Sequence, residues 1–349
     1  MATQIKGPAV FLAQFTTPEP PRNTLEGLAK WASGLGFKGV QLPAWDQKII
    51  DLDKAAASQS YCDELTGKLK GYGLEITELF ALQGQMMAVH PALEELFAGF
   101  HPPLRGPALV EWAQGEVVKA IDASARLGLR GVPVLSGTMA WIMVYPWPQR
   151  PAGIVETSYR ELARRWRPVL DHARDKGLTI NFELHPGDDL FDGATFDMFL
   201  EYADQHPAAC INYDPSHFLL QQLDLYGFIE AYGSRIKGFH VKDAEFNPSA
   251  KQGVYSGMQP WPRRAGRFRT VGDGQVDFRR VFTLLTEAGF DGWAVLEWED
   301  PIRSADQAAS IAAKFIEEHL IETARYAFDD FAGSGADQEA HRRILGIER

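Results

Sequence analysis

Four polar residues stand near the ends of four successive apolar segments in the second half of the chain. They are Glu183, Asp214, His240 and Glu297, in the segments LTINFEL, ACINYDP, IKGFHV and GWAVLEW. If these segments are parallel strands of one closed sheet, their carboxyl ends converge on one point. Three carboxylates and one imidazole suit a hard or borderline divalent cation. Because such a cation polarises a carbonyl or hydroxyl group, the pattern predicts metal-assisted chemistry on a small oxygenated molecule.

The alternation of side chains along each strand supports this grouping. Residues i and i+2 of a strand face the same side, so Asn181 and Glu183 share a face and Phe182 takes the other. In the same way His240 faces away from Phe239. An ordinary strand-end or capping role would explain any one of the acidic residues. It does not explain four groups of matching position and parity, which would repel one another without a cation.

Strand-like and helix-like segments alternate along almost the whole chain, which is typical of parallel βαβ units. We predict strands over residues 8–15, 38–44, 74–81, 131–136, 178–184, 209–214, 236–241 and 292–298. We predict helices over residues 24–35, 58–71, 108–127, 158–176, 194–204, 224–232, 277–288 and 305–328. Several helices end in a glycine just before the next strand, as in GLGFKGV and DKGLTI, and this glycine supplies a left-handed cap.

Eight such units predict an α/β fold, a (β/α)8 TIM barrel with enlarged βα loops and a C-terminal extension. We expect a single barrel domain over residues 1–328 and a C-terminal arm over 329–349. The alternative is an open doubly wound sheet, but no GxGxxG loop follows the first strand. Long segments at 82–107, 137–157 and 243–275 follow strands. They therefore lie on the face where barrel active sites form.

The bulk composition limits the partners. A net charge of −11 argues against nucleic acid and anionic membranes, because both need a basic face. The chain has two cysteines, Cys62 and Cys210, no long apolar run and no signal-peptide pattern. These features predict a cytoplasmic protein without a disulfide framework. Aromatic residues in the long loops are compatible with a homo-oligomer.

Further residues are candidates for binding the substrate. They are His185, His217, Lys242 and Trp45. His185 and Lys242 each lie two residues beyond a predicted ligand on the same strand face, and the DPSH turn brings His217 back over the site. Trp45 could stack on the apolar face of a sugar ring. For each of them the alternative is a structural hydrogen bond, an ion pair or core packing.

The motifs NFELHPGD, NYDPSHF, GFHVKDAEF, VGDGQVDF and VLEWED resemble the xylose isomerase-like TIM-barrel superfamily. The resemblance is to its sugar phosphate isomerase/epimerase branch, which includes ketose 3-epimerases and inosose dehydratase. It covers roughly residues 5–325 and is specific in the C-terminal half. It implies one divalent metal ion held by Glu183, Asp214, His240 and Glu297, with the two glutamates as the catalytic acid/base pair. It also supports His217 as a substrate contact. We expect Mn²⁺, with Mg²⁺, Co²⁺ or Zn²⁺ as alternatives.

Two positions depart from the pattern of the epimerases. Phe246 stands where they usually have an arginine, about six residues after the histidine ligand, and Asp189 stands where they have a second glutamate. Arg267 or Arg269 could supply the missing cation, and we include Arg267 among the predicted substrate-binding residues. Because of these departures the resemblance does not identify a particular ketose.

The sequence thus predicts a divalent-metal-dependent isomerase or epimerase of a sugar or keto-sugar, acting by proton transfer through a metal-stabilised enediolate. The alternative is a metal-dependent lyase with the same first step, either an inosose-type dehydratase or a 3-keto-glycoside-cleaving enzyme acting on a sugar or cyclitol. Two other classes stay open. A non-catalytic sugar-binding protein would not need two carboxylates placed as bases, and a DNA-repair endonuclease would need more histidines and a basic groove.

Overall fold

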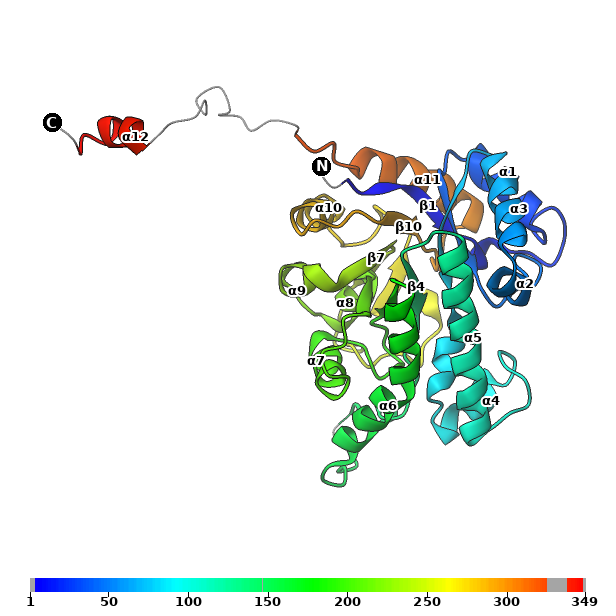
Figure 1. Ribbon diagram of the computed structural model, residues 1–349. Coiled ribbons are helices and arrows are strands. Elements are labelled where there is room, and N and C mark those ends of the chain that lie inside the picture. The colour runs from blue at the N-terminus through cyan, green and yellow to red at the C-terminus, as the bar shows by residue number, and fades with distance from the viewer. Residues whose placement is uncertain (1–3, 146, 325–337, 348–349) are drawn as a thin grey trace.

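The chain forms a parallel β-barrel surrounded by helices in this computed structural model, which describes residues 4–145, 147–324 and 338–347 (Figure 1). The barrel strands are β1 (Lys6–Phe11), β2 (Gly39–Pro43), β3 (Glu75–Phe80), β4 (Gly131–Val134), β5 (Thr179–Glu183), β6 (Ala209–Tyr213), β7 (Ile236–Val241) and β10 (Trp293–Leu296). They pair in the order β3-β2-β1-β10-β7-β6-β5-β4. A parallel bridge between Ala81 and Val134 links the two ends of this order. The predicted TIM barrel is therefore confirmed.

Helices cover the outside of the barrel and the ends of its strands. They are α1 (Leu25–Gly34), α2 (Leu52–Ala57), α3 (Gln59–Lys70), α4 (Glu94–Phe97), α5 (Gly106–Arg126), α6 (Ile154–Asp175), α7 (Gly193–Tyr202), α8 (Pro215–Gln221), α9 (Leu225–Tyr232), α10 (Phe278–Glu287), α11 (Ala305–His319) and α12 (Gln338–Ile344). Side-chain caps fix several starts, such as Thr24 on α1 and Ser304 on α11. No helix in the described ranges is long and apolar enough to span a membrane.

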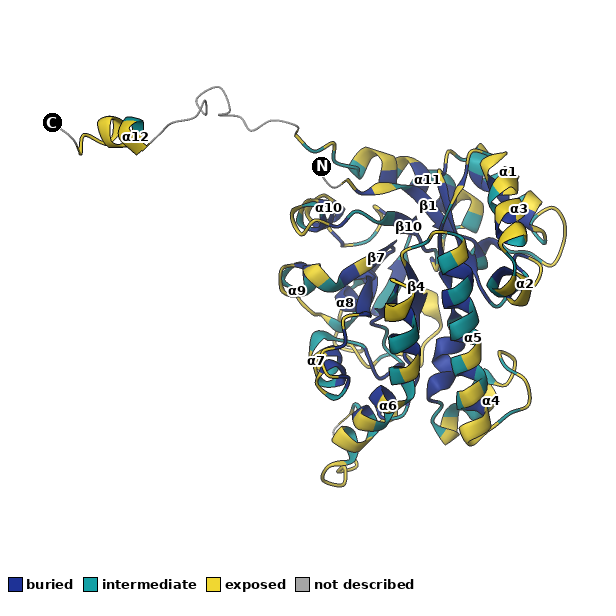
Figure 2. Cartoon of the chain, in the orientation of Figure 1, coloured by how far each residue is buried: buried dark blue, intermediate teal, exposed yellow. Residues whose placement is uncertain are grey.

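The alternation predicted from the sequence divides the apolar residues into two layers. Phe182 points outward and packs edge-on against Trp166, with ring centroids 4.8 Å apart. Inside the barrel a smaller cluster contains Ala9, Phe11, Phe80 and Val295. Burial is accordingly densest on the strands and on the inner faces of the helices (Figure 2). The polar residues that share the barrel interior with this small cluster are thus held between packed walls.

Some predicted boundaries differ from the structure. The first strand ends at Phe11, and residues Leu12–Phe15 form a 3₁₀ turn. The last barrel helix was predicted over 305–328 but ends at His319, because Leu320 adopts an extended conformation with φ −65° and ψ 132°. The short helices α2 and α8 were not predicted. Each has fewer than eight residues, too few for a clear helical period.

Two predicted segments need separate comment. Within 243–275 the chain forms an antiparallel hairpin, β8 (Asp243–Phe246) with β9 (Gly266–Arg269), which the sequence had suggested only as a long loop. The predicted C-terminal arm, 329–349, lies outside the described residues except for 338–347. Helix α12 in that range has no buried residue.

Candidate metal centre and active site

The four predicted ligands meet inside the barrel. Each offers one ligand atom, and these atoms all lie within 4.8 Å of one another. Glu183 ends β5, Asp214 follows β6 and caps α8, His240 lies in β7 and Glu297 follows β10. All four are buried, with Glu297 the most exposed at 8%. The parallel strands thus bring together residues that are up to 114 positions apart in the sequence, since 297 − 183 = 114.

Side chains from the first half of the chain support this cluster from beneath and beside it. Gln14 Nε2 donates to Glu297 Oε1 at 2.9 Å, and the backbone N–H of Trp298 donates to Gln14 Oε1 at 2.8 Å. Gln41 Oε1 lies 3.1 Å from His240 Nε2. The sequence reasoning missed both glutamines. A signal was present for Gln41, which is the one polar side chain in the strand GVQLP.

Lys242 supplies positive charge inside the cluster. Its ammonium Nζ lies 2.9 Å from Glu297 Oε2 and 3.2 Å from Asp214 Oδ2. The side chain is 1% exposed, and the ring of Phe268 on β9 covers it at 4.5 Å from Nζ to the ring centroid. Burial alone would lower the pKa of Lys242, but the surrounding carboxylates raise it well above its usual value, so the lysine is protonated.

Burial and neighbouring charges also oppose each other in setting the pKa values of His240, Glu297 and Asp214. Burial would lower the pKa of His240, but Glu183 and Glu297 raise it well above its usual value. Burial would likewise raise the pKa of Glu297, yet Lys242 and His240 hold it at about 2. For Asp214 burial prevails and raises the pKa to about 6. The cluster therefore contains three carboxyl groups, one imidazolium and one ammonium. The positive charges of His240 and Lys242 balance the carboxylates, as a bound cation would.

His217 lies next to the carboxylates of the cluster, and His185 lies behind it. His217 Nε2 lies 3.3 Å from both Glu183 Oε1 and Asp214 Oδ2. The ring of His185 packs edge-on against His217, with centroids 4.2 Å apart. Burial lowers the pKa of both, to about 3 for His185, so these imidazoles are neutral near pH 7. The structure thus places both residues beside the cluster, as the strand parity and the DPSH turn predicted.

The remaining predicted substrate contacts lie further out. Trp45 packs edge-on against Phe11 and Phe80 of the inner cluster, with centroids 6.1 Å away in each case. Arg267 is engaged within the β8–β9 hairpin, where Nε pairs with Glu245 at 2.5 Å and Nη1 bonds the carbonyl of Pro262. Their roles toward a substrate therefore remain predictions.

Comparison with known proteins assigns this chain to a family. Residues 29–319 match the family described as xylose isomerase-like TIM barrel. The chain belongs to this family. An inosose dehydratase of Clostridium tetani is 29% identical over 167 residues, which are 47% of this chain and 55% of that protein. The chain spans about half the length of the curated relatives it matches.

Solved structures of other proteins share the fold. D-allulose 3-epimerase from Methylomonas sp. has a TM-score of 0.59 and 17% identity, covering 92% of this chain and 100% of that one. The 3-keto-D-glucoside 4-epimerase of E. coli has a TM-score of 0.58 and 14% identity, covering 89% and 98%. At these identities the likeness establishes the fold, and the chemistry must be argued from the site.

Within this family fold the four residues suit one bound metal ion. Their ligand atoms are three carboxylate oxygens and one imidazole nitrogen, a donor set that suits a hard or borderline divalent cation. Asp214 Oδ2 is buried and lies within ion-pair distance of Lys242 and His217, but it accepts no hydrogen bond, so this oxygen can turn to a bound cation. The cluster can therefore hold a metal ion, although the donors do not distinguish among metals.

Asp189, at the position of the second glutamate of the epimerases, has a structural role. Its Oδ1 accepts the backbone N–H groups of Ala140 and Trp141, and its Oδ2 accepts that of Met139, each at 2.8 Å. The side chain is fully buried. It therefore anchors the long segment after β4.

We expect Asp189→Asn to lower the free energy of unfolding by about 2 kcal/mol, because an amide can accept on one side only and its NH₂ group then faces a backbone N–H. Urea denaturation followed by circular dichroism measures this loss. The control is Asp175→Asn, an exposed residue paired with Arg174, for which we expect less than about 0.5 kcal/mol. Equal stability of the Asp189 variant and the unchanged protein would contradict the anchoring role.

Proposed function

We propose that this protein is a divalent-metal-dependent isomerase or epimerase of a sugar or keto-sugar. The observation that carries the proposal is the meeting of Glu183 and Glu297 with Asp214 and His240 in one buried cluster. An isomerisation needs one group to remove a proton and another to return it. We assign these roles to the two glutamates, which lie at the carboxyl ends of β5 and β10, the strands that flank β6 and β7 in the barrel order.

Glu183, Asp214, His240 and Glu297 would hold the metal. Oxygen-rich donors accept several divalent cations, and among them we propose Mn²⁺. When bound, the cation supplies Lewis-acid stabilisation of negative charge on substrate oxygens. His240 would bind through Nδ1, the nitrogen that lies 3.1 Å from Glu297 Oε2. It would therefore give up its Nδ1 proton. Lys242 would no longer be needed to balance the carboxylates, so its ammonium would be free to hold a substrate oxygen.

The chemistry then follows from residues already in place. One glutamate removes the proton from the carbon beside the substrate carbonyl, which gives an enediolate, and the other returns a proton at a different face or carbon. The neutral imidazoles of His217 and His185 can donate hydrogen bonds to substrate hydroxyls or accept them. The hairpin residue Phe268 shields Lys242 from water, which strengthens every electrostatic contact beneath it.

A lyase is the second candidate, and a specific observation favours it. Relatives in sequence include an inosose dehydratase of Clostridium tetani and one of Lacticaseibacillus casei. After the same proton abstraction, a hydroxyl or an aglycone at the β-carbon could be expelled instead of a proton being returned. The substrate would then be an inosose-type cyclitol or a 3-keto-glycoside.

A single assay separates the two candidates. The purified protein is treated with chelator, reloaded with Mn²⁺ and incubated with ketoses, inososes and 3-keto-glucosides, and the products are read by mass spectrometry. Under the main proposal we expect a product of unchanged mass that appears only with metal. A product lighter by water or by an aglycone would establish the lyase instead. Turnover that persists in excess chelator would contradict both.

We further propose that residues 1–328 act as one barrel domain in the cytoplasm, with no nucleic-acid or membrane partner. Both cysteines are free and buried, which suits a reducing compartment. Limited proteolysis tests the domain boundary, and we expect cleavage after 328 to leave metal-dependent turnover intact.

A further inference from the structure

A line of hydrogen bonds runs from the cluster into the barrel floor. His240 Nδ1 faces the carboxylates, 3.1 Å from Glu297 Oε2, and its other nitrogen Nε2 lies 3.1 Å from Gln41 Oε1. Gln41 Nε2 in turn donates to Glu78 Oε2 at 3.3 Å. His240 and Gln41 are at most 1% exposed, and Glu78 is 7% exposed. The three side chains therefore form one buried series, from strand β7 to β2 to β3.

The ring of His240 has little freedom to turn away from this series. It packs against both Phe11 and Phe80, with centroids 6.0 and 6.1 Å away and an angle of 19° between planes in both cases. The two phenyl rings lie side by side, with centroids 5.1 Å apart. The ring plane is thus fixed by packing, while the choice of which nitrogen carries the proton is left to hydrogen bonding. That choice decides whether Nδ1 has a lone pair to offer a metal.

Gln41 can determine which nitrogen of His240 carries the proton only if its own amide group is held in one orientation. An amide that turns its oxygen to His240 accepts Nε2–H and leaves Nδ1 free, whereas one that turns its NH₂ group to His240 favours the opposite tautomer. Glu78 biases the amide because a carboxylate only accepts, so the NH₂ group of Gln41 must face it. Burial raises the pKa of Glu78, and a neutral carboxyl can donate as well as accept, so the bias on the amide is strongest while Glu78 is ionised.

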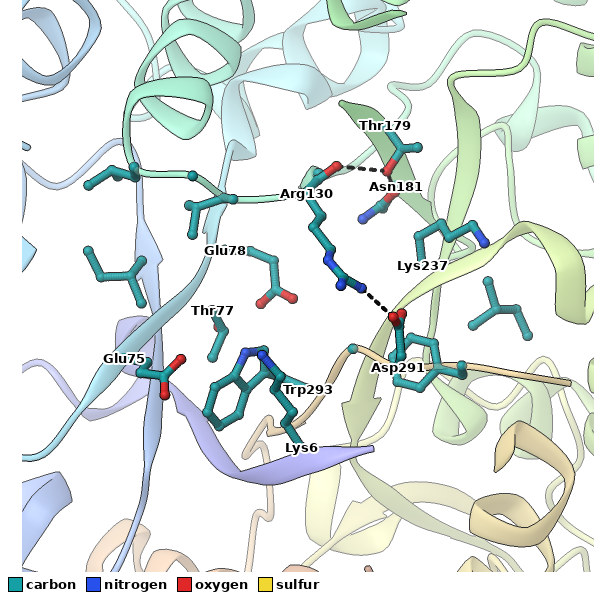
Figure 3. Close-up of a pocket in the computed structure, with 18 of the residues that line it drawn as sticks. Lys6, Glu75, Thr77, Glu78, Arg130, Thr179, Asn181, Lys237, Asp291 and Trp293 are labelled. Atoms are coloured by element: carbon teal, nitrogen blue, oxygen red, sulfur yellow. Dashed lines mark hydrogen bonds and ion pairs between the residues drawn. The ribbon is translucent and has the colours of Figure 1, made fainter. Parts of the chain in front are cut away.

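Glu78 itself stands too far down the barrel to take part in the chemistry. It lines a cavity of about 850 Å³ at the amino ends of the strands. Figure 3 shows its carboxyl group turned into this cavity near Thr77, Trp293 and Arg130, which pairs with Asp291 at 2.6 Å. The proposed substrate face lies at the carboxyl ends of the same strands. Glu78 can therefore act on the metal centre by two routes, the hydrogen bonds through Gln41 and the direct electrostatic interaction of its carboxyl group with His240.

We infer that Glu78 is a positioning residue for the metal centre, which orients Gln41 so that His240 presents Nδ1 as the ligand atom. The inference rests on the proposed metal-dependent function. Partners of a ligating histidine typically change metal affinity by about 10–100-fold when they are removed. Glu78 would act two side chains away from the metal, and it would do so without any contact to substrate.

The test measures Mn²⁺ and Co²⁺ binding to the full chain by calorimetry, with the visible spectrum of bound Co²⁺ as a second readout. We expect Glu78→Leu to raise Kd about 10–100-fold and to alter the Co²⁺ spectrum. Glu78→Gln keeps the shape of the side chain but can donate as well as accept, so it should weaken the bias and raise Kd by a smaller factor than Glu78→Leu. The matched control is Glu75→Gln, an exposed carboxylate of the same strand at the same cavity. It should leave Kd unchanged.

A double-mutant cycle shows whether the effect passes through Gln41. We expect Gln41→Leu to raise Kd by at least as much as Glu78→Leu, and the double variant to bind no more weakly than Gln41→Leu alone. If Glu78→Leu does not fold, Glu78→Met keeps the side-chain length and takes its place in the cycle.

The outcomes separate this inference from the proposed function. Equal metal binding by folded Glu78→Leu and the unchanged protein, or simple additivity in the cycle, overturns the inference alone. Failure of the unchanged protein to bind either cation overturns both. Metal binding that follows the expected pattern, without conversion of any sugar or cyclitol, supports the inference and counts against the proposed reaction.

Discussion

Glu297→Gln is expected to lower kcat for the metal-dependent conversion by about 10²–10⁴-fold, because an amide cannot take up or return the substrate proton. Gln14 still donates to the retained amide oxygen, so the position of the side chain should be kept. The fall should therefore appear in kcat at saturating Mn²⁺ and saturating substrate. Steady-state kinetics with metal content measured in parallel tests the prediction.

The design must separate lost proton transfer from lost metal. Glu297→Gln also replaces a predicted ligand, so its Mn²⁺ affinity is determined by calorimetry and the assay is run well above that Kd. Glu183→Gln should behave in the same way. Glu287→Gln, an exposed glutamate at the end of α10, serves as the control and should retain full turnover. Full activity of Glu297→Gln in metal-saturated protein would exclude Glu297 as an acid/base group.

Lys242→Met is expected to destabilise the protein by about 3–5 kcal/mol when chelator is present, because it leaves buried carboxylates without their partner. In the structure the ammonium contacts Glu297 at 2.9 Å and Asp214 at 3.2 Å. Mn²⁺ should restore much of this lost stability, since a cation bound in the cluster balances the same carboxylates. Urea denaturation with chelator and with Mn²⁺ measures the difference.

Lys237→Met is the matched control for this experiment. Lys237 lies on the same strand, β7, but is exposed. We expect less than about 0.5 kcal/mol for its replacement, with or without metal. A loss for Lys242→Met that is equally large in chelator and in Mn²⁺ would mean that the lysine serves packing alone. The absence of any loss would mean that the carboxylates take up protons without cost.

The residues that meet at the centre could be predicted because they depend on strand periodicity. Glu183 and His240 have an inward parity that follows from the two-residue repeat, and their outward neighbours Phe182 and Phe239 pack against helices as expected. The glycines that end helices just before the next strand marked the boundaries of the repeated strand–helix units. The family relationship then followed from motifs around the same positions, and the match over 29–319 confirmed it.

The neighbours of those residues could not be predicted in the same way. His240 and Gln41 are 199 residues apart and lie on strands that are not adjacent in the sheet, so they meet only across the barrel interior. The sequence contains no local sign of such a contact, because it depends on barrel radius and side-chain length. The same holds for Gln14 beside Glu297 and for Phe268 above Lys242.

The eightfold repeat, the inward face of each strand and the four polar groups at one end of the barrel could all be predicted from the amino-acid sequence. These are properties of nearest neighbours along the chain, which set strand and helix periods and caps. Three contacts became visible in the folded chain alone: Lys242 lies among the buried carboxylates, Asp189 anchors a loop and Glu78 is connected to His240 through Gln41. These are contacts across the closed barrel, where burial and the need to satisfy every polar group select the partner.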